Sequence, residues 1–365
     1  MLTFLHGADF HLDSPFHSLS PDQAAERRQE QRQLLTRLAD AARETRADLI
    51  FLSGDLFDGQ RARPETLQTL YQVLEELEAE IFLAPGNHDP YSPASPYGKL
   101  TWPSHVHIFT TPTPERVDLP HLGAVVYGSA FTSLYRMDSP LAGFRAQPED
   151  ALKFGCFHGD PTSPHSRYGP ISSQELAGSG LDYVALGHIH AASGLQRAGR
   201  TWYAWPGCPE GRGFDETGEK GVYVGQIEGG HVALDFLPLA RRRYLTPSLD
   251  ITGRDPAQAM EDLMDRSRPE DIVRIALVGQ RDPDNEPNLT ALTALASSYF
   301  YSASLRDQTQ LSQALWARME EDTLTGLFLR NMRQRMEDAP EEEHPLLERA
   351  VRFGLAALEG REEPR

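Results

Sequence analysis

The chain has 365 residues, is 39% hydrophobic and carries a formal net charge of −18. This composition is typical of a globular protein, and the length favours two to three domains. The sequence has no apolar run of the length that spans a bilayer, so we expect no membrane insertion. The acidic excess argues against a general nucleic-acid-binding protein, because phosphate contacts need Lys and Arg.

The first residues and the cysteines indicate where the protein acts. The segment Met1–His6 reads as a strand and lacks the basic and apolar regions of a signal peptide. Cys156 and Cys208 lie far apart in the sequence and do not suggest a disulfide framework. We therefore expect a cytoplasmic protein.

The first 84 residues alternate short apolar runs with longer helical patterns, which is typical of a layered α/β domain. The predicted elements are a strand at Leu2–His6, a helix at Ala24–Thr45, a strand at Asp48–Ser53, a helix at Pro64–Ala79 and a strand at Ile81–Ala84.

After about residue 120 the predicted strands follow one another more closely. Gly-rich turns separate the last four of them, which favours antiparallel pairing. A mixed sheet, or two stacked sheets with outer helices, fits this pattern. The strands are Ala124–Tyr127, Phe154–His158, Tyr183–Leu186, Thr201–Trp205, Gly221–Ile227 and Val232–Leu237.

The residues after Arg241–Arg243 and Pro247 predict a separate C-terminal part. Residues 248–305 read as a small α/β unit with helices at Ala257–Asp265 and Leu289–Ser297, and strands at Ile272–Val278 and Tyr299–Leu305. Residues 307–336 place apolar residues at helical spacing. An acidic linker, Asp338–His344, and a last helix, Pro345–Leu358, follow. The apolar residues at helical spacing are Leu311, Leu315, Met319, Leu324, Leu327, Phe328, Met332 and Met336.

Five short polar motifs stand in order along the first 190 residues, and most of them follow a predicted strand. Strand ends in α/β sheets are where functional loops gather. Each motif alone is weak: Asp-x-His can be chance, Asp55 can cap a helix, and a single His is more often packed than a ligand. The five are Asp9-Phe-His11, Gly54-Asp55-Leu-Phe-Asp58, Gly86-Asn87-His88-Asp89, His158-Gly-Asp and Gly187-His188-Ile-His190.

Taken together, the motifs predict a site for two divalent metal ions. Carboxylate, imidazole and carbonyl oxygen ligands suit such ions, and one aspartate can bridge the pair. Two ions about 3.5–4 Å apart can clamp a phosphate and activate water at neutral pH. The motifs contain no cysteine, which disfavours a structural zinc site.

At these residues the sequence resembles the calcineurin-like metallophosphoesterase superfamily over about residues 1–240. Within it, the opening His6–Asp13, the Gly54–Asp58 block and the Gly187–His190 ending are similar to the SbcD/YhaO-type DNA-repair nuclease subunits. This resemblance implies an α/β fold, a two-sheet αββα sandwich with a small α/β cap domain and a helical tail. The corresponding domains are residues 1–245, 246–305 and 306–365.

The resemblance also implies a role for each site residue. Asp9, His11 and His190 hold the first ion, Asn87, His158 and His188 hold the second, and Asp55 bridges both. His88 serves the leaving oxygen or steadies the phosphate. Asp58 orients His88, unless it is only a helix-start or turn aspartate. Manganese is the expected metal, with Mg²⁺, Fe²⁺ and Zn²⁺ as alternatives. The reaction is in-line attack of a metal-bridging hydroxide on a DNA phosphodiester.

The partners follow from the same resemblance, which implies DNA and an SbcC/YhaN-like ATPase. The apolar stripe from Leu311 to Met336 is a candidate docking surface; alternatively it packs on the cap domain or forms a homodimer. Two other functions stay open: hydrolysis of nucleotides or phosphoproteins, and a non-catalytic metal-bearing scaffold. The extra 120 residues favour the nuclease, and His88 disfavours the scaffold. Four arginines are candidates for phosphate contact, or else surface charges: Arg61, Arg63, Arg136 and Arg167.

Overall fold

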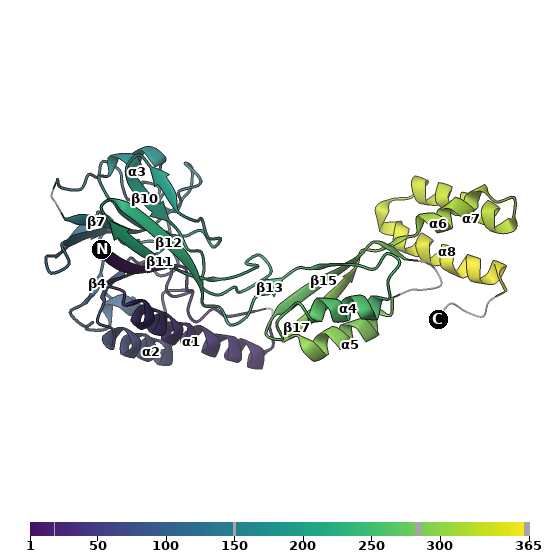
Figure 1. The fold of residues 1–365 in the computed structure, drawn as a ribbon, viewed down its shortest axis with the longest axis horizontal. Coiled ribbons are helices and arrows are strands. Elements are labelled where there is room, and N and C mark those ends of the chain that lie inside the picture. The colour runs from purple at the N-terminus through teal and green to yellow at the C-terminus, as the bar shows by residue number, and fades with distance from the viewer. Residues whose placement is uncertain (18, 149–150, 282–286, 361–365) are drawn as a thin grey trace. The chain divides into compact units, whose positions relative to one another are not determined.

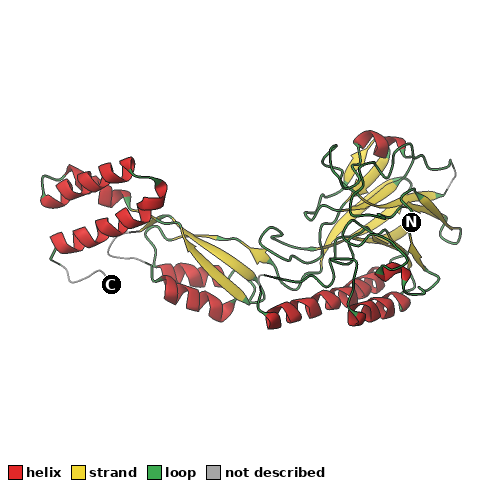
Figure 2. Cartoon of the chain, turned by 180° about the vertical axis from the view of Figure 1, so that it is seen from behind, coloured by secondary structure: helices red, strands yellow, loops and turns green. Residues whose placement is uncertain are grey.

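The computed structural model describes residues 1–17, 19–148, 151–281 and 287–360. The chain divides into two compact units, Met1–Arg243 and Tyr244–Arg365. The ribbon in Figure 1 and the cartoon in Figure 2 show the elements of both units. Within the described residues, no helix is both long enough and apolar enough to cross a membrane.

The first sheet of the N-terminal unit has six strands in the order β12-β11-β1-β2-β3-β4. The first four strands in the sequence pair in parallel, and β11 and β12 extend the sheet by antiparallel pairing. The carboxyl ends of β1 to β3 therefore meet at one edge. The strands are β1 (Leu2–Gly7), β2 (Leu49–Leu52), β3 (Glu80–Leu83), β4 (Val106–Ile108), β11 (Gly221–Glu228) and β12 (His231–Pro238).

Helices α1 (Pro21–Thr45) and α2 (Pro64–Glu75) cover the outer face of this sheet. The helix α1 begins three residues before the predicted start, because Ser20 and Gln23 form a capping box. The helix α2 ends four residues before the predicted Ala79. Their leucines pack on the outward side chains of β1 to β3, and the packed residues include Leu34, Leu38, Leu70, Leu74, Ile50 and Ile81.

The second sheet packs on the inner face of the first and has the order β5-β6-β7-β8-β10-β9. Aromatic rings from both sheets fill the space between them; Phe4 of β1 lies 4.5 Å from Tyr183 of β8, centroid to centroid. Helix α3 (Ser173–Gly178) covers the outer face. The strands are β5 (Glu115–Leu119), β6 (Ala124–Gly128), β7 (Leu152–His158), β8 (Tyr183–Gly187), β9 (Gln196–Ala198) and β10 (Thr201–Ala204). The layers are helix, sheet, sheet and helix, so the predicted αββα sandwich is confirmed.

One part of the predicted pairing is wrong. The strands β8 and β10 run parallel, and β10 forms its hairpin with the short strand β9. The strand β9 has three residues, Gln196-Arg-Ala198, which carry no apolar alternation that could have predicted it. The antiparallel expectation holds for β11 and β12, which belong to the other sheet.

The second unit begins with a four-stranded sheet in which β15 pairs in parallel with β13, β14 and β17. Helices α4 (Pro256–Met264) and α5 (Leu289–Tyr299) pack on it around Ile275, Leu277 and Met260. The strands are β13 (Tyr244–Leu245), β14 (Ser248–Asp250), β15 (Ile272–Val278) and β17 (Ser302–Asp307), and a short pair, β16 (Gln280–Arg281) and β18 (Gln310–Leu311), follows.

The apolar residues that show helical spacing over residues 307–336 belong to several separate elements in the structure. Leu311 lies in β18, and two hydroxyl caps then start separate helices: Ser312 caps α6 (Gln313–Ala317) and Thr323 caps α7 (Leu324–Asp338). Helix α8 (His344–Leu358) completes the tail. The helices share a small core of their own, made of Leu311, Leu315, Leu329, Met332, Val351 and Leu355. The predicted boundaries at residues 245 and 305 stay predictions.

Candidate metal centre

The polar motifs lie where strands of the two sheets end. Asp9 and Asp55 follow β1 and β2, and Asn87 lies four residues after β3. From the facing sheet, His158 is the last residue of β7, and His188 and His190 follow β8. Because the sheets are stacked, these ends face each other, and residues as far apart in the sequence as Asp9 and His190 meet.

The backbone of the ligand loops is unusual. Asp9, His11, Asp55 and His188 all have positive φ angles, of 53°, 44°, 48° and 99°. Residues other than glycine rarely adopt this backbone conformation, which costs on the order of 1–3 kcal/mol and is found mainly at functional sites. Hydrogen bonds from Asp9 N to Gly54 O (3.0 Å) and from His11 N to Asp55 O (2.9 Å) hold the first two loops together.

Two glycines allow the loops to approach. A Cβ on Gly86 would lie 2.2 Å from Asp55 Oδ1, and a Cβ on Gly187 would lie 1.9 Å from the carbonyl oxygen of Ser53. Each glycine directly precedes a predicted ligand, Asn87 or His188. Glycine is therefore required at these positions for steric reasons.

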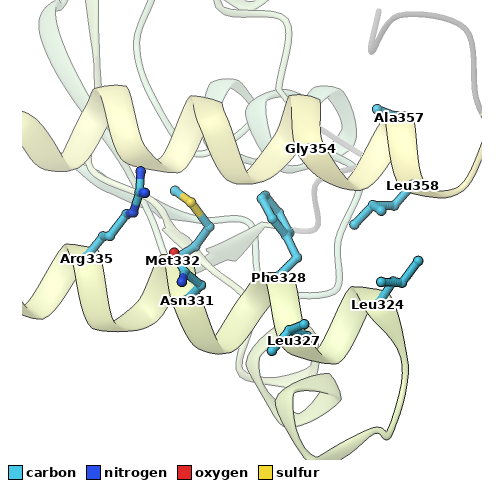
Figure 3. A pocket seen from close by; sticks show the side chains of 9 residues that line it. All are labelled: Leu324, Leu327, Phe328, Asn331, Met332, Arg335, Gly354, Ala357 and Leu358. Atoms are coloured by element: carbon cyan, nitrogen blue, oxygen red, sulfur yellow. The ribbon is translucent and has the colours of Figure 1, made fainter.

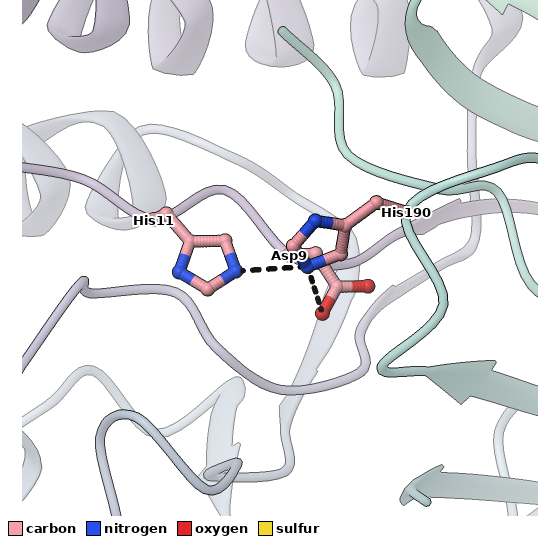
Figure 4. Close-up of side chains that lie close together, drawn as sticks. All are labelled: Asp9, His11 and His190. Atoms are coloured by element: carbon pink, nitrogen blue, oxygen red, sulfur yellow. Dashed lines mark hydrogen bonds and ion pairs between the residues drawn. The ribbon is translucent and has the colours of Figure 1, made fainter. Parts of the chain in front are cut away.

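Asp9, His11 and His190 form the first donor group, shown in Figure 4. The Nε2 atoms of His11 and His190 are 3.2 Å apart, and Asp9 Oδ1 lies 4.0 Å from His190 Nε2. Asp9 and His11 are fully buried, and His190 is 30% exposed. Asp9 also accepts the backbone N–H of His188 at 3.0 Å.

The two facing imidazoles need a cation between them. Nδ1 of His11 lies 3.0 Å from Asp58 Oδ1, and Nδ1 of His190 lies 2.7 Å from Glu216 Oε1. Both Nδ1 atoms therefore donate to carboxylates, which leaves the Nε2 lone pairs facing each other. A proton can occupy this gap in the metal-free protein. Two nitrogens about 2.1 Å from one metal ion lie roughly 3.0–3.4 Å apart at ordinary ligand angles, which fits the observed spacing.

The second donor group consists of Asn87, His158 and His188. His158 donates from Nδ1 to the Ser53 carbonyl (3.0 Å), and its Nε2 lies 2.9 Å from Asn87 Oδ1. The ring of His188 lies 5.3 Å from that of His158, centroid to centroid. Both imidazoles are held neutral, since burial lowers the pKa of each to about 4.

Asp55 lies between the two groups. Its Oδ2 is 3.9 Å from His11 Nε2 and 3.5 Å from His158 Nε2, while its Oδ1 accepts the backbone N–H of His88 at 2.8 Å. A carboxylate with donors of both groups on either side is placed to bridge two ions. The structure thus brings all seven predicted ligands together, and their assignment to particular ions stays a prediction.

Burial leaves the acids of the centre poorly solvated. It raises the pKa of Asp9 to about 8, and the nearby Asp55 adds to this rise. Burial also raises the pKa of Asp55. For His190, burial alone would lower the pKa, but the hydrogen bond to Glu216 raises it above its usual value. Positive charge from bound metal ions would relieve these unfavourable charges.

His88 and Asp58 lie at the open side of the centre. The His88 side chain is 46% exposed, and its Nδ1 is 3.7 Å from Asp58 Oδ1. The shorter contacts of Asp58 are with His11 Nδ1 (3.0 Å) and Arg212 (3.1 Å). Asp58 therefore holds a predicted metal ligand, and its proposed orientation of His88 stays a prediction.

The sequence motifs missed Arg212 and Glu216, which surround His190. Arg212 donates to Glu216 (2.7 Å) and to Asp58 (3.1 Å) and thereby links the partners of His190 and His11. Burial alone would raise the pKa of Glu216, but the hydrogen bonds with His190 and Arg212 lower it far below its usual value. The available signal was the polar, Gly-rich segment 207–219 after a predicted strand.

The four arginines suggested for phosphate contact have different surroundings. Arg63 lies 3.9 Å from both Asp13 and Glu65, and Arg136 donates to the Pro112 carbonyl and to Ser129. Arg61 is exposed. Arg167 is exposed and lies over the ring of Tyr135, which lines a pocket with His88. Arg167 is thus linked through Tyr135 to the side of the centre where His88 lies.

We expect that replacing Glu216 with Ala weakens Mn²⁺ binding about ten- to a hundredfold, because His190 loses the carboxylate that sets its tautomer and orientation. Glu216→Gln should lose less, since its amide oxygen can still accept the Nδ1 proton. Competition with a fluorescent chelator measures the affinity. The matched control is Glu228→Gln, at a side chain that is 74% exposed. Equal affinities for wild type and Glu216→Ala would contradict this role.

The raised pKa values of Asp9 and His190 predict that the stability of the folded protein depends on pH. Asp9, with a pKa of about 8, and His190, with a raised pKa, bind protons more tightly in the folded metal-free protein than when unfolded. Their contribution to stability is therefore lost as pH rises, for Asp9 from its usual pKa of 3.8 up to about 8 and for His190 from its usual pKa of 6.5 upward. Metal ions displace these protons, so stabilisation by Mn²⁺ should grow over the same range.

Thermal denaturation with Mn²⁺ and with chelator, at pH 6.5, 7.2 and 8.0, measures this difference. Calorimetry at pH 7 in two buffers of different ionisation enthalpy should detect proton release on Mn²⁺ binding. A Mn²⁺-induced shift in Tm that is the same at all three pH values would argue against this account.

Comparison with known proteins agrees with this geometry. The chain is 32% identical over 246 residues to the uncharacterized metallophosphoesterase YhaO of Bacillus subtilis, a match that covers 64% of this chain and 60% of the relative. It is 25% identical over 295 residues to the DNA double-strand break repair protein Mre11 of Methanopyrus kandleri, covering 74% of this chain and 63% of that protein. It is 26% identical over 275 residues to the SbcD component of the nuclease SbcCD of Bacillus subtilis, covering 64% of this chain and 68% of that protein.

The match thus spans about 60% of the length of the first two relatives. Residues 2–192 match the family of calcineurin-like phosphoesterases, and this range includes all seven predicted ligands and His88. Enzymes of this family use a dinuclear metal centre, which the two donor groups on either side of Asp55 fit. The chain therefore belongs to the calcineurin-like phosphoesterase family.

Proposed function

We propose that the protein is a nuclease subunit that hydrolyses DNA phosphodiesters in DNA repair. The observation that carries this proposal is the largely buried set of seven candidate donors with a solvent-exposed histidine, His88, at its open side. A DNA substrate is supported by the names of two relatives, a double-strand break repair protein and a nuclease component. Manganese is the metal we expect; oxygen and imidazole donors without a thiolate suit it.

The residues divide the chemistry among them. Two bound ions would supply an activated water and neutralise charge on the phosphate. Asp9, His11 and His190 would hold one ion, Asn87, His158 and His188 would hold the other, and Asp55, which lies between the two groups, would be their shared ligand. His88 is placed to donate a proton to the leaving oxygen, or a hydrogen bond to the phosphate. Asp58 and Glu216 keep Nε2 of His11 and of His190 directed at the centre.

Two other functions are alternatives to the nuclease. A phosphodiesterase or phosphatase for nucleotides or phosphoproteins would use the same centre, but it would not need the additional unit Tyr244–Arg365. A non-catalytic scaffold for an ATPase would not need His88 beside the donor set. We therefore favour the nuclease over both.

We further propose an SbcC/YhaN-like ATPase as partner, docked on the helical tail. Helices α7 and α8 leave a groove between them, lined by apolar side chains that include Leu324, Leu327 and Leu358 (Figure 3). Leu324 is 72% exposed and Leu327 is 58% exposed. Phe328 fills the floor of the groove below Gly354, where a Cβ would lie 2.2 Å from its ring. A second copy of this chain is the alternative occupant of the groove.

Digestion of end-labelled duplex and hairpin DNA with Mn²⁺ tests the function, with a 3′,5′-cyclic nucleotide as the competing substrate. Wild type should cleave DNA, and Asp55→Ala should lose cleavage because both ions lose their shared ligand. His88→Ala should keep its Mn²⁺ affinity and lose about a hundredfold or more in rate. Hydrolysis of the cyclic nucleotide without DNA cleavage would reject the nuclease, and full activity of His88→Ala would reject its role.

The net charge of −18 predicts that the isolated chain binds long duplex DNA weakly, so that a basic partner surface has to contribute. Filter binding at low salt, with catalysis blocked by chelator, measures this affinity. A Leu327→Glu variant should lose partner binding and keep nuclease activity. The control is Glu320→Gln, at an exposed side chain of the same unit, which should keep both. Tight, salt-sensitive duplex binding by the chain alone would contradict the need for a partner.

A further inference from the structure

An aromatic row leads away from the metal centre. The ring of Tyr168 lies 5.0 Å from that of the predicted ligand His188, and the ring of Tyr135 lies 5.8 Å from that of Tyr168. The interplanar angles are 39° and 37°, so neighbouring rings are tilted toward a stacked arrangement rather than perpendicular. The row begins at the metal centre and ends at a side chain that is 52% exposed.

The same two tyrosines line a pocket that opens on the catalytic side. Its volume is about 380 Å³, and it brings Tyr135, Tyr168 and Leu134 together with Asn87 and His88. Asp58, Gly59 and Gln60, from the loop after β2, also line this pocket. A group placed against Tyr135 in this pocket would therefore lie beside the predicted leaving-group histidine.

The loops that carry the row are held in place. Backbone hydrogen bonds of 2.8 Å run from Arg136 N to Arg167 O and from Gly169 N to Arg136 O, so the segments around Tyr135 and Tyr168 form a short parallel bridge. The side chain of Arg136 anchors this bridge by donating to the Pro112 carbonyl at 2.7 Å. The aromatic faces are thus presented on a built platform.

The chemistry of the platform suits a nucleobase. Aromatic faces bind bases by stacking, largely without regard to sequence, and Arg adds a positive charge that suits the attached backbone. Arg167 supplies such a charge, with its guanidinium carbon 5.6 Å from the centre of the Tyr135 ring. Because the protein as a whole carries a net charge of −18, it repels nucleic acid in general. A local cation and a stacking surface beside the centre would attract a nucleotide at this place.

We propose that Tyr135 and Tyr168, with Arg167, bind an unpaired base next to the phosphate that is cleaved, so that the centre prefers single-stranded or frayed nucleic acid. This inference rests on the proposed nuclease function. A base inside a duplex is stacked on its neighbours and cannot offer a face to Tyr135, whereas an unpaired base can. Tyr135 and Tyr168 are positioning residues that set substrate preference.

The test combines removal of the side chain with removal of the base. The substrates are short single-stranded oligonucleotides with one phosphodiester among cleavage-resistant linkages. One carries normal bases, and two carry an abasic residue on the 5′ or the 3′ side of that phosphodiester. For wild type with Mn²⁺, one of the two abasic substrates should lose about tenfold in kcat/KM. Tyr135→Ala should lose about tenfold on the normal substrate and nothing further on that abasic substrate, and Tyr135→Phe should restore the rate.

The control variant is Met137→Ala, on the same loop and 67% exposed, which should behave as wild type on all substrates. An unchanged Mn²⁺ affinity shows that each variant keeps an intact centre. If wild type cleaves normal and abasic substrates equally, or if Tyr135→Ala slows all of them equally, the platform does not bind a base, and the nuclease proposal stands. If wild type cleaves no oligonucleotide but hydrolyses bis(4-nitrophenyl) phosphate, the nuclease proposal and this inference both fail.

Discussion

Two buried carboxylates, those of Asp9 and Asp55, lie among four imidazoles without enough positive charge around them. Asp9 and Asp55 are each 1% exposed, burial raises the pKa of both, and the charge of Asp55 raises the pKa of Asp9 further. An ionised carboxylate away from water is costly unless it is paired or coordinates a metal ion. Four residues of this cluster, Asp9, His11, Asp55 and His188, also have positive φ angles, a costly backbone conformation that is found mainly at functional sites.

The stacked sheets make this convergence possible. The first sheet contributes the loops after β1, β2 and β3, and the second contributes the end of β7 and the loop after β8. Asp89 helps to hold two of these loops in register, because its carboxylate accepts the backbone N–H of Phe57 (2.9 Å) and of Gly86 (2.8 Å). The helix α1 also contributes, since Gln31 donates to the His11 carbonyl at 2.9 Å.

A buried ionic network places the residues that support His190. Arg27 of α1 pairs with Glu30 and Glu210 and donates to the Gly211 carbonyl at 3.0 Å. This fixes the start of the segment that carries Arg212 and Glu216. The helix that covers the first sheet therefore reaches the metal centre twice, through His11 and through this segment. The opposite side of the centre, with His88 and the pocket, stays open to solvent.

That the seven predicted ligands and His88 come together could be predicted from the sequence, because each is part of a short motif near a strand end; their role as ligands stays a prediction. The layers of the first unit could also be predicted, since alternating apolar runs and helical patterns depend on local spacing. The link between Asp58 and His11, and the roles of Arg212 and Glu216, could not be predicted, because they depend on contacts between loops of different sheets.

The sequence by itself thus determined which candidate donors lie near strand ends, because the residue types and the glycines beside them are local features. Only the tertiary structure decided how the donors are aimed, which acids hold the imidazoles, and that Tyr135 and Tyr168 lie beside His88. It also showed that β8 pairs with β10 in parallel and that hydroxyl caps divide the apolar stripe of the tail. The physical reason is that these outcomes depend on the packing of segments far apart in the chain.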